Sequence, residues 1–127
     1  MGLLGIATFE GDLTLGATKL INSGVADISG TTAQTITGAI EDGLVQNSNT
    51  AALVTFEDAL GVGTIVDEIQ SDASSDTLFK AVIDTTLLDL KGQVTLTQDD
   101  NTATELDMAA TGTTLIIDDT VLNGQTL

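Results

Sequence analysis

The sequence contains no cysteine, histidine, proline, tyrosine or tryptophan, and its only cations are Lys19, Lys80 and Lys91, so arginine is absent too. Without cysteine there is neither a disulfide framework nor a thiolate nucleophile. Without histidine there is no Ser–His or Cys–His catalytic pair and no histidine-ligated zinc or iron site. Without arginine there is no bidentate clamp for a phosphate or a carboxylate. These absences predict a protein that is not an enzyme.

Positive charge is scarce, because 19 acidic residues stand against three lysines and give a formal net charge of −16. Binding to a phosphate backbone or to anionic lipid needs clustered Lys or Arg, so we expect no nucleic-acid partner. No stretch approaches the roughly 18 apolar residues that a membrane span requires, so we expect no membrane insertion. The charge indicates a solubilising surface for a salty or crowded setting. The alternative is a cation-dependent assembly whose carboxylates meet across subunit contacts.

Threonine and glycine are abundant, with 22 and 13 copies, and apolar residues make up 42% of the chain. Threonine suits pleated surfaces and glycine suits turns, so the composition predicts one mainly β domain over residues 1–127. Recurring turn signals are compatible with a sandwich, a barrel or a small β-solenoid. We favour an antiparallel sandwich or jelly-roll-like domain. A solenoid is less favoured because these glycines show no fixed spacing: Gly16, Gly24, Gly30, Gly38, Gly43.

The C-terminal stretch from residue 91 to 127 alternates apolar residues with threonines and acids, which is typical of half-buried strands. A polar connection predicts a hairpin that pairs Gln93–Thr97 with Thr104–Met108. Thr113–Asp118 is expected to be a further strand, and Asn123-Gly124 favours a type I′ turn. We expect this stretch to form the rigid core sheet, with an acidic face toward solvent or cations.

One short helix is expected over about residues 76–84. Ser74 or Ser75 can cap it, and Asp76 lies in the first turn, where the helix dipole favours an acid. Apolar residues then follow at helical spacing: Leu78, Phe79, Val82, Ile83, Leu87.

Calcium is the one ligand that the sequence suggests, through a group of hard oxygen donors in and after a turn. The candidate ligands are Asp99, Asp100, Asn101, Glu105 and Asp107. The EF-hand pattern is not met, because Ala103 and Thr104 occupy its fifth and sixth positions, and the sixth requires glycine. The alternative is that these are solvated turn residues. No other cofactor is expected.

The apolar N-terminus, residues 1–10, has two interpretations. It is either a strand of its own domain or an arm that completes the sheet of a neighbouring subunit, since an exposed strand edge is a template for addition. The predicted subunit contact is formed by Leu3, Leu4, Ile6 and Phe9. The segment lacks a basic region and reaches Glu10 within ten residues, so it does not have the pattern of a signal peptide.

With catalysis, nucleic acid and membranes set aside, the sequence predicts a self-assembling structural subunit whose partners are its own copies and other structural subunits. The favoured setting is the virion, as a head decoration (cement), capsid or tail protein. The alternative is an extracellular or cell-surface filament or pilus subunit joined by N-terminal strand addition. A third hypothesis is a soluble acidic binding module.

Overall fold

The computed structural model describes residues 2–98, 100–108 and 110–117, and all the regular structure in those residues is β-strand. The strands are β1 (Gly2–Leu3), β2 (Ile6–Phe9), β3 (Leu13–Thr14), β4 (Leu20–Asn22), β5 (Val25–Ile28), β6 (Gln34–Thr37), β7 (Ile40–Glu41), β8 (Leu44–Asn47), β9 (Leu53–Phe56), β10 (Val66–Ser71), β11 (Asp76–Phe79), β12 (Asp84–Leu90), β13 (Gln93–Leu96), β14 (Thr102–Asp107) and β15 (Thr114–Ile117).

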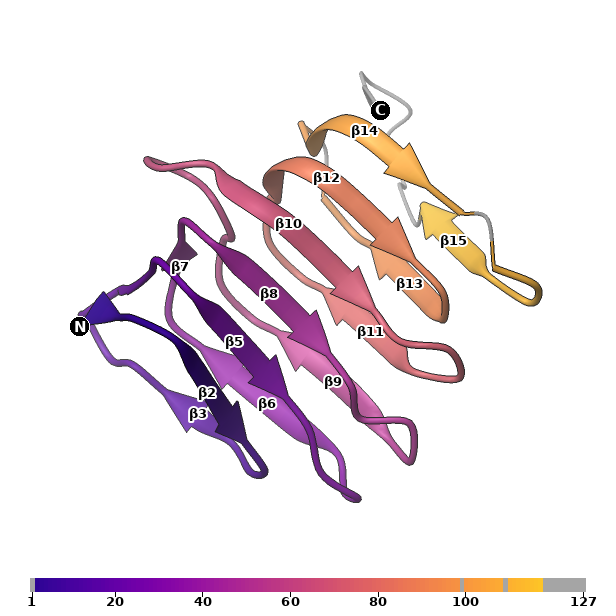
Figure 1. Cartoon of the computed structure of the whole chain (residues 1–127), viewed down its shortest axis with the longest axis horizontal. Helices are drawn as coiled ribbons and strands as arrows, with labels where there is room; N and C mark the ends of the chain where they lie inside the picture. The colour runs from indigo at the N-terminus through magenta and orange to yellow at the C-terminus, as the bar shows by residue number, and fades with distance from the viewer. Residues whose placement is uncertain (1, 99, 109, 118–127) are drawn as a thin grey trace.

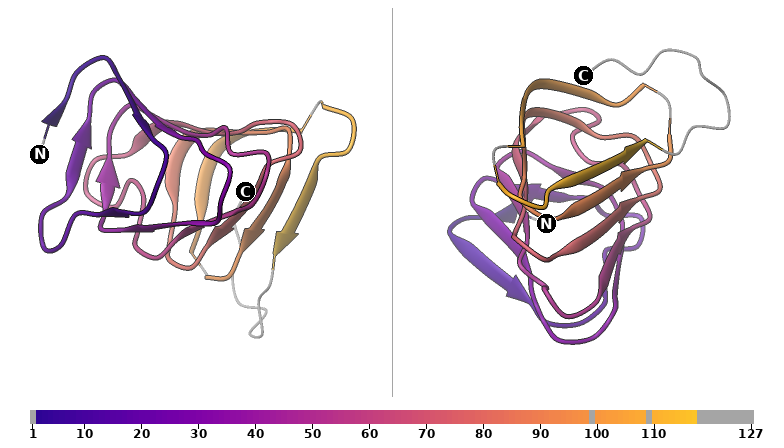
Figure 2. Two further views of the ribbon diagram at one scale, coloured as in Figure 1. Left: turned by 90° about the horizontal axis from the view of Figure 1, so that it is seen from below. Right: turned by 90° about the vertical axis from the view of Figure 1, so that its right-hand side faces the viewer.

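The chain winds as a β-solenoid of about six turns, which we call rungs 1 to 6 from the N-terminal end (Figure 1). Each full rung places one strand in a short sheet and one in each of two six-stranded sheets. Sheet 1 has the order β2-β5-β8-β10-β12-β14 and sheet 2 the order β3-β6-β9-β11-β13-β15, so rung order follows chain order. The short sheet, β1-β4-β7, continues as single bridges through Leu60 and Ile83. The right-hand view of Figure 2 looks toward the C-terminal end of the coil.

All the strand pairs of the described residues are parallel, so the predicted antiparallel sandwich or jelly roll is wrong. The predicted hairpin is also wrong, because β13 lies in sheet 2, between β11 and β15, whereas β14 lies beside β12 in sheet 1. A half-buried strand shows a period of two whether its neighbours run parallel or antiparallel, so the alternation could not reveal the direction of pairing. The Asn123-Gly124 turn lies outside the described residues.

The predicted helix over residues 76–84 is wrong as well. This segment contains β11, and Ile83 forms a bridge of the short sheet before β12 begins. Phe79 is buried while Leu78 faces outward and is half-buried, which is strand alternation. Packing against the neighbouring rungs overrides the local helical spacing, because β11 pairs on both edges, with β9 and with β13.

The core consists of inward-facing side chains stacked in register across the rungs, and we call each such set a column. One column of sheet 1 consists of Ala7, Ala26, Val45, Ile69, Leu88 and Leu106. One column of sheet 2 lists Leu13, Ile36, Phe56, Phe79, Leu96 and Ile117. The rings of Phe56 and Phe79 stack with centroids 5.0 Å apart. The buried members of these columns lie in rungs 2 to 5, so the C-terminal stretch contributes only β13 to the fully buried core.

Several buried side chains are polar, and they form hydrogen bonds with one another and with the backbone at the corners between sheets 1 and 2. Asn47 donates to Thr77 Oγ1 at 2.7 Å and accepts a bond from the Asn49 amide at 2.9 Å. Asn49 in turn donates to Gln34 Oε1 at 2.9 Å, and Gln34 donates to the carbonyl of Phe9 at 2.9 Å. This network links rungs 1 to 4 at one corner. Burying these polar groups is tolerated because each of them is hydrogen-bonded.

The corner that leads into sheet 1 brings backbones of successive rungs into contact. Gly43 has a φ of 62°, and a Cβ there would lie 1.8 Å from the carbonyl oxygen of Asn22. At Gly24, one rung earlier, a Cβ would lie 2.0 Å from the oxygen of Gly5. Glycine is required at both positions because no side chain fits between the stacked corners.

Candidate assembly surface

The two ends of the solenoid hold most of the exposed apolar surface among the described residues. Nine large hydrophobic side chains are exposed in the described part of the chain, and six of them belong to rung 1 or rung 6. The six are Leu4, Ile6, Leu106, Met108, Ile116 and Ile117. Figure 1 shows rung 1 and rung 6 at opposite ends of the long axis. Exposed apolar side chains that gather at one end of a molecule can form an interaction site.

The N-terminal end contains all four residues of the predicted subunit contact. Leu4 is 87% exposed and Ile6 is 75% exposed, whereas Leu3 and Phe9 are half-buried against the core. Leu3 lies in β1 and pairs with Asn22, and Ile6 and Phe9 lie in β2 and pair with Val25 and Ile28. The segment is therefore folded onto its own domain, and the outer edges of β1 and β2 have no strand beside them in the described part of the chain.

The C-terminal end exposes residues that would be core one rung earlier. Leu106 continues the column of Leu88, which is fully buried, and Ile117 continues the column of Leu96, which is also fully buried. Leu106 and Ile117 are exposed, because within the described residues no strand follows β14 or β15 in either sheet. Terminal repeats of a solenoid need a polar cap or a partner for this reason.

The outer face of sheet 1 is strongly acidic in its C-terminal half. Lys91 Nζ lies 2.8 Å from Asp89 Oδ2, and this hydrogen bond is the main cause that raises the pKa of Lys91 above its ordinary value. Partial burial, together with the nearby Asp89 carboxylate, raises the pKa of Glu68 above its ordinary value. The other lysines are also paired, Lys19 with Glu41 at 2.9 Å and Lys80 with Glu57 at 2.8 Å.

None of these lysines lies in rung 1 or rung 6, so the charged residues described at the two ends are acids. Rung 1 has Glu10 and Asp12 in its corner, and rung 6 has Glu105 and Asp107 on the outer face of β14. The backbone edge of β2 itself carries no charged side chain, since its sequence is Ile-Ala-Thr-Phe. The edge formed by β2 is therefore apolar and uncharged, although Glu10 and Asp12 follow in the corner, and the edge formed by β14 is apolar and acidic.

The residues of the predicted calcium site are only partly brought together. Asn101 is buried, and its side chain holds the corner backbone by accepting a bond from the Ile83 amide and donating to the Gln98 carbonyl. Glu105 and Asp107 point outward from alternate positions of β14, and Asp100 is exposed before that strand with a φ of 63°. Asp99 lies outside the described residues. No group of three or more acids, histidines or cysteines in the described part is placed to hold a metal ion.

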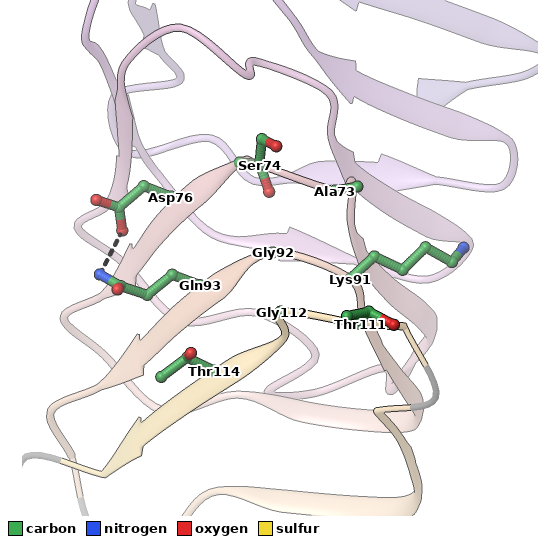
Figure 3. Close-up of a pocket in the computed structure, with 10 residues that line it drawn as sticks. Ala73, Ser74, Asp76, Lys91, Gly92, Gln93, Thr111, Gly112 and Thr114 are labelled. Atoms are coloured by element: carbon green, nitrogen blue, oxygen red, sulfur yellow. Dashed lines mark hydrogen bonds between the residues drawn. The ribbon is translucent and has the colours of Figure 1, made fainter.

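A polar notch of about 370 Å³ lies at the corner between sheets 1 and 2 (Figure 3). It forms because the rung 5 corner is short, with only Lys91 and Gly92 between β12 and β13, whereas the corners of rungs 4 and 6 are longer. Hydroxyl groups line it, together with Gln93, which donates to Asp76 Oδ1 at 3.3 Å. The buried Oγ of Ser75 has no hydrogen-bond partner among the described residues, but the backbone of Gly92 lies against it. Among the described residues that line the notch, Asp76 provides the only carboxylate, so these residues do not offer a carboxylate pair for acid–base chemistry.

No described segment is a helix of the length and apolar character needed to cross a membrane. No protein-family model, no curated protein and no solved structure matches the chain.

Proposed function

We propose that this chain is a non-enzymatic structural subunit that self-associates through the N-terminal end of its solenoid. The observation that carries the proposal is the exposure of Leu4 and Ile6, at 87% and 75%, beside the outer edges of β1 and β2. They are the most exposed large hydrophobic side chains of the described residues. An open, uncharged and apolar strand edge favours the addition of another strand.

The setting that we propose is the virion, where a self-associating β subunit serves as a building block. A coil whose sheets grow along one axis suits a linear part, such as a tail component, better than a closed shell. The same axial growth also favours the second candidate, an extracellular filament subunit joined by strand addition. Immunogold labelling of native material distinguishes these settings, because the label decorates particles in one case and cell-surface fibres in the other.

Like charges oppose this association, because each copy has a formal net charge of −16. The Debye length falls to about 3 Å at 1 M salt, so the repulsion between copies is largely screened there. We therefore expect the chain to form larger species as the NaCl concentration rises from about 0.05 M to 1 M. Analytical ultracentrifugation at several protein concentrations measures this directly.

A double substitution at the proposed contact tests its location. Leu4→Gln with Ile6→Gln should prevent the association at 1 M NaCl, because the uncharged edge then buries amides instead of apolar side chains. The matched control is Val62→Gln with Ile65→Gln, which removes two apolar side chains that are 53% and 40% exposed in a loop away from both ends. The control should associate like the unmodified chain. The proposal would be contradicted if both variants associated equally, or if the unmodified chain did not associate at all.

A further inference from the structure

Resting on that proposed function, we infer that the partner of the N-terminal end is the C-terminal end of a second copy. In this head-to-tail contact β14 of one copy lies beside β2 of the next, and β15 lies beside β3. Both sheets then continue across the contact as parallel ladders.

The columns of the solenoid set the register of this contact. On the outer face of sheet 1, Ile6 begins a row of paired residues that ends at Glu105, and Thr8 begins one that ends at Asp107. Continuing the ladder by one strand therefore places Glu105 of one copy opposite Ile6 of the next, and Asp107 opposite Thr8. The inward Leu106 meets the small Ala7, which belongs to the same core column.

The exposed apolar side chains are distributed as this contact requires. Leu106 and Ile117 lie at the open end of core columns in rung 6, and Ala7 and Leu13 begin the same columns in rung 1. One end thus supplies the core neighbours that the other end lacks. A contact between two N-terminal ends would leave the C-terminal apolar surface uncovered.

Charge decides between the remaining arrangements. A contact between two C-terminal ends would bring Glu105 and Asp107 of one copy against the same acids of the other, and like charges directly opposite are destabilising. In the head-to-tail contact these acids meet the uncharged Ile6 and Thr8 of the next copy. Because the two surfaces differ, the contact does not close on itself, and each addition leaves a new end for the next copy.

Engineered disulfides test both the partner and the register, and the chain has no cysteine of its own to interfere. Residues opposite one another in neighbouring strands are about 4.8 Å apart, which a disulfide can bridge. Two pairs are in register, Thr8→Cys with Asp107→Cys and Ile6→Cys with Glu105→Cys. Within one copy Thr8 and Asp107 are five strand steps apart, roughly 24 Å, so a bond between them must join two copies.

The matched controls recombine the same four cysteines out of register, as Thr8→Cys with Glu105→Cys and Ile6→Cys with Asp107→Cys. Their separation across the contact is about 8 Å, beyond the roughly 7 Å limit between Cα atoms for a disulfide. All four double variants and the single variants are oxidised at about 1 M NaCl and compared on non-reducing gels. The in-register pairs should give a ladder of covalent oligomers beyond the dimer, at least tenfold more than the controls.

The outcomes separate this inference from the function on which it rests. Covalent dimers from Thr8→Cys alone, with no ladder from either in-register pair, would show a contact between two N-terminal ends and overturn the inference. Association without register-specific bonds would overturn it too, while the proposed function stands. If neither the variants nor the unmodified chain associates, both this inference and the proposed function are contradicted.

Discussion

Two glycines with the same backbone conformation provide a sharp test of the stacked corners. Gly43 has a φ of 62° and Gly16 a φ of 63°, so alanine meets the same left-handed backbone at each. That conformation costs a non-glycine residue about 1–2 kcal/mol. A Cβ at Gly16 has nothing within 4 Å, whereas at Gly43 it would lie 1.8 Å from the Asn22 carbonyl oxygen. The two substitutions therefore carry the same backbone strain, and they differ only in whether the new Cβ clashes with a neighbouring rung.

Relieving the clash at Gly43 requires the rungs to separate at this corner. The bonds at risk are those from the Leu44 amide to the Gly24 carbonyl and from the Asp67 amide to the Gly43 carbonyl, both 2.9 Å long. A buried polar group left unpaired costs about 1–3 kcal/mol, so with the backbone cost Gly43→Ala should lower the free energy of unfolding by about 2–5 kcal/mol in total. Gly16→Ala should lower it by about 1 kcal/mol. Urea unfolding followed by far-ultraviolet circular dichroism measures both, and equal losses would refute the close stacking of these corners.

Three further substitutions test the interior and the acidic face by the same unfolding measurement. Phe79→Ala should cost about 3–5 kcal/mol, because it empties a central core column beside Phe56, and a loss below about 1 kcal/mol would contradict its place there. Asn47→Ala should cost about 2–4 kcal/mol, because it leaves Thr77 Oγ1 and the Asn49 amide without their partner, and a neutral effect would contradict the corner network. Glu68 has a raised pKa in the fold, so its contribution to stability is fully present below its ordinary pKa of 4.5 and is lost as the pH rises through the folded value. Glu68→Gln should therefore flatten the decline of stability above pH 4.5, and an unchanged slope would contradict the raised pKa.

The sequence predicted the strands better than their arrangement. The strand expected over Gln93–Thr97 is present as β13, in which Val94 and Leu96 are fully buried while Gln93 is exposed. The strand expected over Thr113–Asp118 is confirmed as β15 within the described residues. Direction of pairing could not be derived, because alternation reports which face is buried and not which neighbour lies beside the strand.

The sequence contains a glycine repeat that extends over only three rungs. Gly5, Gly24 and Gly43 are spaced by 19 residues each time and stack at one corner, where the amide of the next residue bonds the glycine one rung earlier. The extra glycines at other corners hid this spacing. The next rung is longer, because the loop over residues 61–65 is inserted before β10, and that loop covers the buried carboxylate of Glu41. Three matching rungs were too few for a period to stand out from the sequence alone.

The sequence proposed the residues of the subunit contact, but it did not show which of them are exposed or why. The apolar run from Leu3 to Phe9 indicated a subunit contact, and the structure adds that only Leu4 and Ile6 are strongly exposed, because Leu3 and Phe9 pack against the core. The apolar C-terminal surface at Leu106 and Ile117 was missed, since those residues looked like ordinary core positions. Leu106 and Ile117 are exposed because they are the last members of their core columns. The local sequence pattern does not show where a column ends.

The most direct test of end-to-end assembly is the axial repeat of the assembled material, measured by cryo-electron microscopy at about 1 M NaCl. Each copy contributes six strands to sheet 1, and neighbouring strands are about 4.7–4.9 Å apart. Head-to-tail stacking with one strand spacing at each contact therefore predicts fibres whose subunits repeat every 28–29 Å or so along the axis. Fibres with that repeat and a continuous strand spacing would confirm the account. Closed rings, lateral sheets or isolated monomers under the same conditions would contradict it.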